Sequence, residues 1–292
     1  MKSFTKNVLL GAGILLAAGC SKEIKYNIDL APEQLVINGL FSPQSGINVQ
    51  LYRSAKVGIN NLDEVRVSGA DCRLYREGVL TGILTEITTG RYLLDTSQTT
   101  FPIDKPYTLI CRAAGLPEAQ SQALWIPEPI EVSAPVVKRG IRSIINPNIE
   151  GFKISNILTD PAPSKKNFYT TYLADQSITI VSGMVLQELH EKFACDYTNF
   201  PNTTFSDICL SSNPINLNFV TEFSDQIEKA SPLIFIIAHT DSTFYRYNQF
   251  VATYPRHTID FLVTDPEPTP SNIINGYGII GLINSRSWVI EL

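Results

Sequence analysis

The sequence is poor in the patterns on which metal chemistry and covalent catalysis depend. No Gly-x-Ser-x-Gly elbow and no Cys-His nucleophile signature occurs in its 292 residues. Acidic residues such as Asp160, Asp225 and Asp265 have no defined separation, and turns or caps explain them. The three histidines lack the local spacing of zinc ligands: His190, His239 and His257. We therefore expect no metal site, no cofactor and no enzymatic activity.

Charge and long hydrophobic runs are also scarce. Charged side chains make up 17% of the chain, with 28 acidic and 23 basic residues, and this mildly acidic balance argues against nucleic acid as a partner. Hydrophobic residues make up 44%, which is enough for a folded core. Beyond the N-terminus, no stretch approaches the roughly 18 uninterrupted apolar residues of a membrane-spanning helix. We expect a folded body that has no membrane span of its own.

The N-terminus has the pattern of a bacterial lipoprotein signal. Lys2 and Lys6 precede an apolar run over residues 8–18, which is too short to cross a bilayer as a stable helix. The run ends in Leu16-Ala17-Ala18-Gly19-Cys20, which gives a signal peptidase small residues and a cysteine at the mature first position. An incidental cysteine in an ordinary secretory signal is the weaker interpretation.

This pattern predicts where the mature protein begins and how it is held. We expect a signal peptide over residues 1–19, lipidation of Cys20 and a polar tether over residues 20–32. Diacylglycerol on the sulfur and a further acyl chain, such as palmitate, on the amine would make membrane anchoring stable.

Four further cysteines remain for disulfide bonding: Cys72, Cys111, Cys195 and Cys209. An even number in an oxidising compartment predicts disulfides, although four cysteines allow three connectivities. Cys195 and Cys209 bracket a short polar loop, and we favour this pair. Cys72 and Cys111 lie in separate strand-like segments, where they either form a second disulfide or stay buried as free thiols.

Short alternating runs separated by turn residues predict a mainly β fold. Residues 47–52 alternate apolar and polar side chains as a half-buried strand does. We expect a β-sandwich of immunoglobulin or transthyretin type over residues 33–128, ending near Ile126-Pro127-Glu128-Pro129. Residues 129–292 are then a second β-rich domain with at least one short helix.

The expected helix follows Asp241 or Ser242, either of which is a good N-cap. Phe244, Tyr247 and Val251 follow at helical spacing, and we expect the helix to end before Pro255. The aromatic residues crowded into this region fit core packing better than a surface for sugars or peptides: Tyr245, Tyr247, Phe250 and Tyr254.

A literal G-x-G-x-x-G occurs near the C-terminus, at Gly276, Gly278 and Gly281. A dinucleotide site needs this turn inside a βαβ unit with an acidic residue about 20 positions further on. The 11 residues that follow Gly281 cannot complete such a unit. We therefore expect these glycines to permit positive φ angles or a close backbone approach beside a final strand.

The chain resembles a known family in motifs spread over nearly all of its mature length. These motifs are Ile37-Asn38-Gly39, Gly69-Ala70, Gly90-Arg91-Tyr92, Pro106-Tyr107-Thr108-Leu109, Thr159-Asp160-Pro161, Asn167-Phe168-Tyr169, Phe223-Ser224-Asp225, Pro270-Ser271-Asn272-Ile273 and Asn275-Gly276-Tyr277-Gly278-Ile279-Ile280-Gly281. In them the sequence is similar to the outer-membrane lipoproteins classed as domain of unknown function 4249. Such proteins occur in Gram-negative bacteria that use SusC-like importers.

The resemblance implies a role beside a transporter. Members look like companions of TonB-dependent outer-membrane transporters, so we expect a non-catalytic accessory that docks on one or captures a nutrient such as a glycan or peptide. The alternative is a structural or adhesive surface lipoprotein. Ser21-Lys22-Glu23 after the lipid site is compatible with export to the cell surface, although the periplasmic face stays open.

Overall fold

The computed structural model divides the chain into two units, Met1–Pro32 and Glu33–Leu292. The structure describes residues 32–54, 61–142, 148, 150–161, 165–175, 180–182, 184–186, 203–210, 213–222, 232–257 and 269–291. Cys20, Cys195 and the expected signal peptide lie outside these residues. In the part of the chain that is described, no helix has both the length and the apolar character of a membrane span.

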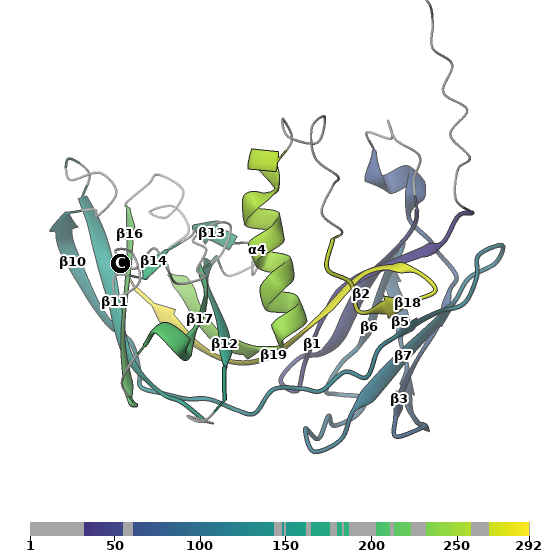
Figure 1. Cartoon of the computed structure of the whole chain (residues 1–292), viewed down its shortest axis with the longest axis horizontal. Coiled ribbons are helices and arrows are strands. Elements are labelled where there is room, and N and C mark those ends of the chain that lie inside the picture. The colour runs from purple at the N-terminus through teal and green to yellow at the C-terminus, as the bar shows by residue number, and fades with distance from the viewer. Residues whose placement is uncertain are drawn as a thin grey trace, which may run out of the picture. The chain divides into compact units, whose positions relative to one another are not determined.

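Strands make up most of the second unit (Figure 1). The elements up to residue 128 are β1 (Leu35–Ser42), β2 (Gly46–Arg53), η1 (Leu62–Val65), β3 (Asp71–Arg76), β4 (Val79–Ile83), β5 (Thr85–Thr88), β6 (Arg91–Leu94), β7 (Tyr107–Arg112) and β8 (Ala119–Ser121). Those that follow are β9 (Glu131–Val132), β10 (Val136–Arg142), β11 (Glu150–Thr159), β12 (Phe168–Ala174), β13 (Ile180–Ser182), β14 (Val185–Leu186), β15 (Thr203–Ser206), η2 (Asp207–Cys209), β16 (Ile215–Glu222), β17 (Leu233–Thr240), α4 (Ser242–His257), β18 (Ile273–Ile274) and β19 (Tyr277–Ile290). The predicted mainly β fold with a short helix is confirmed.

The described strands form three sheets. One follows the order β13-β12-β17-β19-β1-β2-β6-β5, with β15 also paired to β12. A second follows β10-β11-β16-β14 with β9 beside β11, and a third follows β18-β8-β7-β3-β4. All described pairings are antiparallel except that of β1 with β19, so the first and last described strands meet in parallel.

Two hydrophobic cores lie between these sheets. The first collects buried side chains of residues 35–126, including Phe41, whose ring meets Tyr107 edge-on at 5.1 Å. The second collects buried side chains of residues 130–237. Strand β19 contributes to both, with Leu282 in the first core and Ile290 in the second.

Strand β19 changes partner halfway along its length. Residues 277–282 pair in parallel with β1, from Val36↔Tyr277 to Phe41↔Leu282. Residues 283–290 then pair antiparallel with β17, from Thr240↔Ile283 to Leu233↔Ile290. Figure 1 shows this yellow strand running beside β1 and on beside β17. A single sheet therefore contributes to both cores.

The helix begins where the sequence predicts and ends later. The Asp241 carboxylate accepts hydrogen bonds from the backbone N–H of Thr243 at 3.0 Å and of Phe244 at 3.3 Å, so Asp241 is the N-cap. The predicted end before Pro255 is wrong, because α4 continues to His257. A proline in the last turn removes one backbone hydrogen bond and leaves the preceding turns intact.

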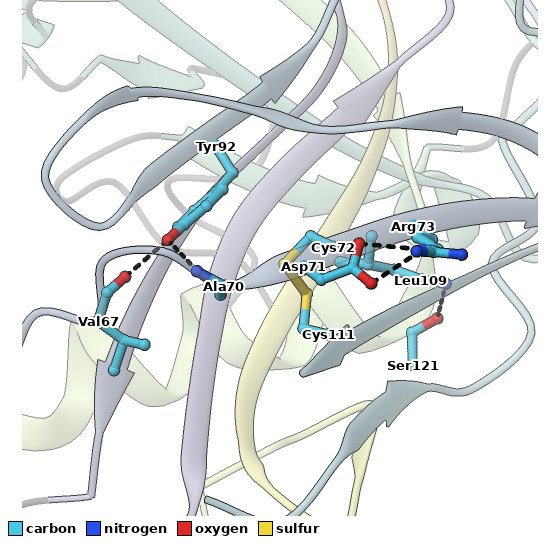
Figure 2. The surroundings of a disulfide bond; sticks show 9 residues. All are labelled: Val67, Ala70, Asp71, Cys72, Arg73, Tyr92, Leu109, Cys111 and Ser121. Atoms are coloured by element: carbon cyan, nitrogen blue, oxygen red, sulfur yellow. Dashed lines mark hydrogen bonds and ion pairs between the residues drawn. A yellow bond between two sulfur atoms is a disulfide. The ribbon is translucent and has the colours of Figure 1, made fainter. Parts of the chain in front are cut away.

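A disulfide joins Cys72 of β3 to Cys111 of β7 in the first core (Figure 2). The two residues are directly opposite in the antiparallel pair, with their Cα atoms 4.2 Å apart, and both are fully buried. The sequence leaves open whether Cys72 and Cys111 form a disulfide or stay buried as free thiols. The structure contains the disulfide.

Replacing both Cys72 and Cys111 by alanine should lower the free energy of unfolding by about 3–4 kcal/mol, because the bond closes a loop of 39 residues. Urea unfolding followed by circular dichroism measures the loss. Wild-type protein unfolded without a reductant is the reference, so that any other disulfide is the same in both samples. An unfolding midpoint equal to that of the oxidised protein would contradict a stabilising bond.

Beside the disulfide, a corner of the first core is held by polar side chains. The Tyr92 hydroxyl accepts from the Ala70 N–H at 2.9 Å and donates to the Val67 carbonyl at 3.0 Å, as Figure 2 shows. The Glu86 carboxylate accepts from the N–H groups of Gly69 at 2.9 Å and Gly90 at 2.8 Å. Chiefly through the Gly69 bond, these contacts hold the pKa of Glu86 below its usual value of 4.5.

This lowered pKa predicts a loss of stability in acid. The contribution of Glu86 is present at neutral pH and disappears as the pH falls below 4.5 and through the lowered pKa. Glu86→Gln should cost about 1 kcal/mol at pH 7, since the carboxylate is partly open to solvent. Chemical unfolding at pH 7 and at pH 3 should show the difference between variant and wild type shrinking in acid. A difference that is constant with pH would refute this role.

Candidate functional site

The C-terminal glycine motif lies where β19 meets the rest of the body. A Cβ atom on Gly276 would come within 2.6 Å of the Leu35 carbonyl oxygen, and one on Gly278 within 2.3 Å of the Ile37 carbonyl oxygen. Gly278 also has a φ of +104°. A Cβ atom on Gly281 would come within 2.5 Å of the Phe244 ring. The motif thus provides the close backbone approach that its sequence predicts, and it builds a joint between β1, β19 and α4.

Buried polar side chains fix the same joint. Asn272 donates to the Ile280 carbonyl at 2.8 Å and accepts from the Ile280 N–H at 2.9 Å. The Asp241 carboxylate accepts from the Leu282 N–H at 2.9 Å, and Asn284 donates to the Pro127 carbonyl at 2.9 Å. Burial raises the pKa of Asp241, while its backbone hydrogen bonds oppose that rise. These side chains hold the backbone at the point where β19 changes partner.

Gly278→Ala should destabilise the protein by about 3 kcal/mol, because the new methyl group meets the Ile37 carbonyl and the φ angle is unfavourable. Gly115→Ala is the matched control. Gly115 also has a positive φ, +76°, but no atom lies within 4 Å of the place that a methyl group would take, so about 1 kcal/mol is expected. Equal losses in urea unfolding would mean that the close approach at Gly278 does not matter.

A separate polar cluster lies at one end of the second core. The side-chain Nδ2 of Asn167 donates to Asp160 Oδ1 at 2.7 Å and to Asp207 Oδ2 at 2.9 Å. The backbone N–H of Asn167 donates to the other Asp207 oxygen at 3.0 Å. All three residues are less than 10% exposed. We take Asp160, Asn167 and Asp207 as the candidate site and call them the carboxylate cluster.

Strand pairing brings these residues together from distant parts of the chain. Asp160 directly follows β11, and Asn167 directly precedes β12. Phe168 pairs with Ser206 between β12 and β15, which places Asn167 beside Asp207 at the start of η2. The backbone N–H of Asp160 donates to Asn213 Oδ1 at 3.1 Å, which ties the cluster to the segment before β16.

Burial and mutual repulsion shape the acidity of the cluster. Burial raises the pKa of Asp207, and the nearby Asp160 carboxyl adds to the rise. The fully buried Tyr169 has its pKa raised by burial and by the charges of both carboxyls. Burial lowers the pKa of His239, whose Nδ1 lies 2.9 Å from the Glu128 carbonyl oxygen. The cluster therefore holds two carboxyl groups in a place that disfavours two negative charges.

The other candidates from the sequence are dispersed. Tyr245 is buried and its ring lies 4.6 Å from that of Phe168, in agreement with core packing. Cys209 ends η2, while its expected partner lies outside the described residues, so that disulfide stays a prediction. His257 is the last residue of α4. Outside the described residues lie Cys20, His190, Cys195, Asp225 and Asp265.

Sequence reasoning does not find the carboxylate cluster. The sequence assigns Asp160 to a turn, and nothing in its spacing indicates Asp207 as a neighbour. The available signal is indirect, because Thr159-Asp160-Pro161 and Asn167-Phe168-Tyr169 are both among the motifs of the family resemblance. Across the part of the chain that the structure describes, no three His, Cys, Asp or Glu side chains gather as a metal-binding group.

Comparison with known proteins gives a family match. A family model described as Domain of unknown function (DUF4249) matches residues 21–287, which is nearly the whole chain. The match begins directly after Cys20. No curated protein matches the chain significantly.

Proposed function

The chain belongs to the DUF4249 family, and we propose that it is a lipid-anchored, non-catalytic accessory of a TonB-dependent outer-membrane transporter. In this role it docks on the transporter or presents a nutrient to it. The observation that carries the proposal is the order of segments at the N-terminus. A lipobox ending in Cys20 is followed at once by the family domain, which starts at residue 21.

The proposed anchor leaves the body free to meet a membrane neighbour. Residues 21–32 lie between the lipid site and the second unit, which starts at Glu33. A chain of this length spans at most about 40 Å when fully extended. The body is therefore kept within a short distance of the membrane surface, which raises its effective concentration toward a transporter in the same membrane. We place it on the outer membrane, facing the cell exterior.

An apolar sheet edge supports docking. Strand β4 is an edge strand of the third sheet, and β5, which follows it in the chain, is an edge strand of the first sheet. Large apolar side chains are exposed there: Val79 (71%), Leu80 (46%), Ile83 (51%) and Ile87 (46%). Edge strands are usually protected by charge or covered, and exposed apolar groups mark interaction sites. We call Val79, Leu80, Ile83 and Ile87 the apolar edge and propose that it contacts the transporter.

Affinity purification of the tagged chain from solubilised outer membranes of its host tests the partnership. A transporter should be recovered in near-equal amount, and Cys20→Ala should abolish that recovery because the anchor is lost. A lipoprotein recovered alone would overturn the proposal and favour the structural or adhesive role.

Variants of the apolar edge test the docking surface in the same purification. Val79→Lys combined with Ile83→Lys should lower transporter recovery at least tenfold, since two charges would enter the contact. Val136→Lys is the control, because Val136 is similarly exposed (67%) on β10, in the second sheet. Circular dichroism should show all variants folded. Undiminished recovery with the double variant would remove the apolar edge from the interface.

A further inference from the structure

Two large apolar side chains are exposed at the bend between β18 and β19. Ile274 is 45% exposed and Tyr277 is 48% exposed, on either side of Asn275 and Gly276. Asn275 has a φ of +56°, a left-handed conformation that asparagine tolerates better than most residues. The glycines on either side of Tyr277 permit a close backbone approach, but that approach does not explain an exposed aromatic ring between them. The bend therefore presents apolar surface that the packing of the fold does not require.

This bend lies beside the point where the proposed tether joins the folded body. A Cβ atom on Gly276 would come within 2.6 Å of the carbonyl oxygen of Leu35, the first residue of β1. Tyr277 pairs with the next residue of β1, Val36. The tether ends at residue 32 and joins β1 through residues 33 and 34. The bend is therefore close to the segment that leads to the lipid site.

The two residues that join the tether to β1 are held at the end of β2. Glu33 forms an ion pair with Arg53 at 3.1 Å. The backbone N–H of Gln34 donates to Ser54 Oγ at 3.0 Å, and the Ser54 N–H donates to the Gln34 carbonyl at 2.8 Å. The tether therefore leaves the body from a fixed position. Because Glu33 and Arg53 carry opposite charges, this pair adds no net charge beside the bend.

We propose that Ile274 and Tyr277 insert into the surface of the membrane that holds the lipid on Cys20. This inference rests on the lipid anchor of the proposed function. A tether over residues 21–32 reaches at most about 40 Å, so the part of the body next to Glu33 is kept close to the lipid headgroups. Tyrosine favours the boundary between headgroups and acyl chains, where its ring lies in an apolar layer and its hydroxyl stays hydrated. Isoleucine adds apolar area that the same layer accepts.

A lipid surface fits this bend better than a protein partner does. Two exposed apolar side chains supply far less area than the roughly 800 Å² that each partner contributes to a stable protein interface. A membrane needs no complementary shape, and an anchored body meets it at a high effective concentration. Insertion of the bend would limit the rotation of the body on its tether. It would thereby fix which surfaces the body presents to a neighbour in the same membrane.

Fluorescence quenching by lipid tests the contact. The full lipidated chain carrying Tyr277→Trp is reconstituted in phosphatidylcholine vesicles that have bromine on the acyl carbons nearest the headgroup. Wild-type protein gives the background from the native Trp125 and Trp288. Bromine should remove about half of the added emission, because the new ring lies at that depth. The matched control is Val289→Trp, near the other end of β19, where the native side chain is 70% exposed. Its added emission should change little.

Flotation of the same samples separates this contact from the anchor. Wild-type protein should float with the vesicles, and failure to float would overturn both the anchor and the contact. Flotation with equal quenching of the two tryptophan variants would overturn the contact alone. If Tyr277→Trp does not fold, Ile274→Trp provides the same test. Adding Ile274→Asp to Tyr277→Trp should lower the quenching to the level of the control, because a carboxylate is costly to place in the apolar layer. Quenching that stays high in this double variant would contradict a shared insertion.

Discussion

The pairing of one strand with two unlike partners determines the architecture of this protein. Strand β19 lies parallel to β1 over residues 277–282 and antiparallel to β17 over residues 283–290. Because its side chains enter both hydrophobic cores, neither core is complete until the C-terminal strand is in place. Contacts between residues far apart in the sequence are slow to form, because the intervening chain must close into a loop first. Residues 33–292 form one compact unit that contains two hydrophobic cores.

That constraint explains the composition of the C-terminal motif. A strand that lies close to β1 on one side and beneath α4 on the other has no room for side chains at Gly276, Gly278 and Gly281. Ile280 lies opposite Gly39 in the parallel pairing, and Asn272 satisfies both the N–H and the carbonyl of Ile280. The glycines and Asn272 of this segment thus serve the geometry of the joint. Residues that serve the fold in this way leave any ligand undetermined.

Local features of the fold could be predicted from the sequence, and long-range ones could not. The alternation over residues 47–52 lies in β2, and Asp241 caps the helix as its residue type suggests, because both depend on neighbours within a few positions. The opposition of Cys72 and Cys111 depends on the register between β3 and β7, which no local pattern specifies. The meeting of Asp160 with Asp207 depends likewise on β12 pairing with β15. The sequence therefore offers Cys111 as one of several possible partners of Cys72 and gives no indication that Asp160 meets Asp207.

Environment rather than residue type gives the acidic side chains their different roles. Glu86 accepts backbone N–H groups at a partly open corner, so its charged form is favoured and stabilises the first core. Asp207 is buried beside a second carboxyl, so its charged form is disfavoured. Asn167 donates to both carboxyls from its backbone and side-chain N–H groups, and these hydrogen bonds oppose the effect of burial on the pKa of Asp207. Glu86 and Asp207 thus show opposite effects of environment on the same chemical group, because backbone N–H donors favour the charged form at one site while burial beside a second carboxyl disfavours it at the other.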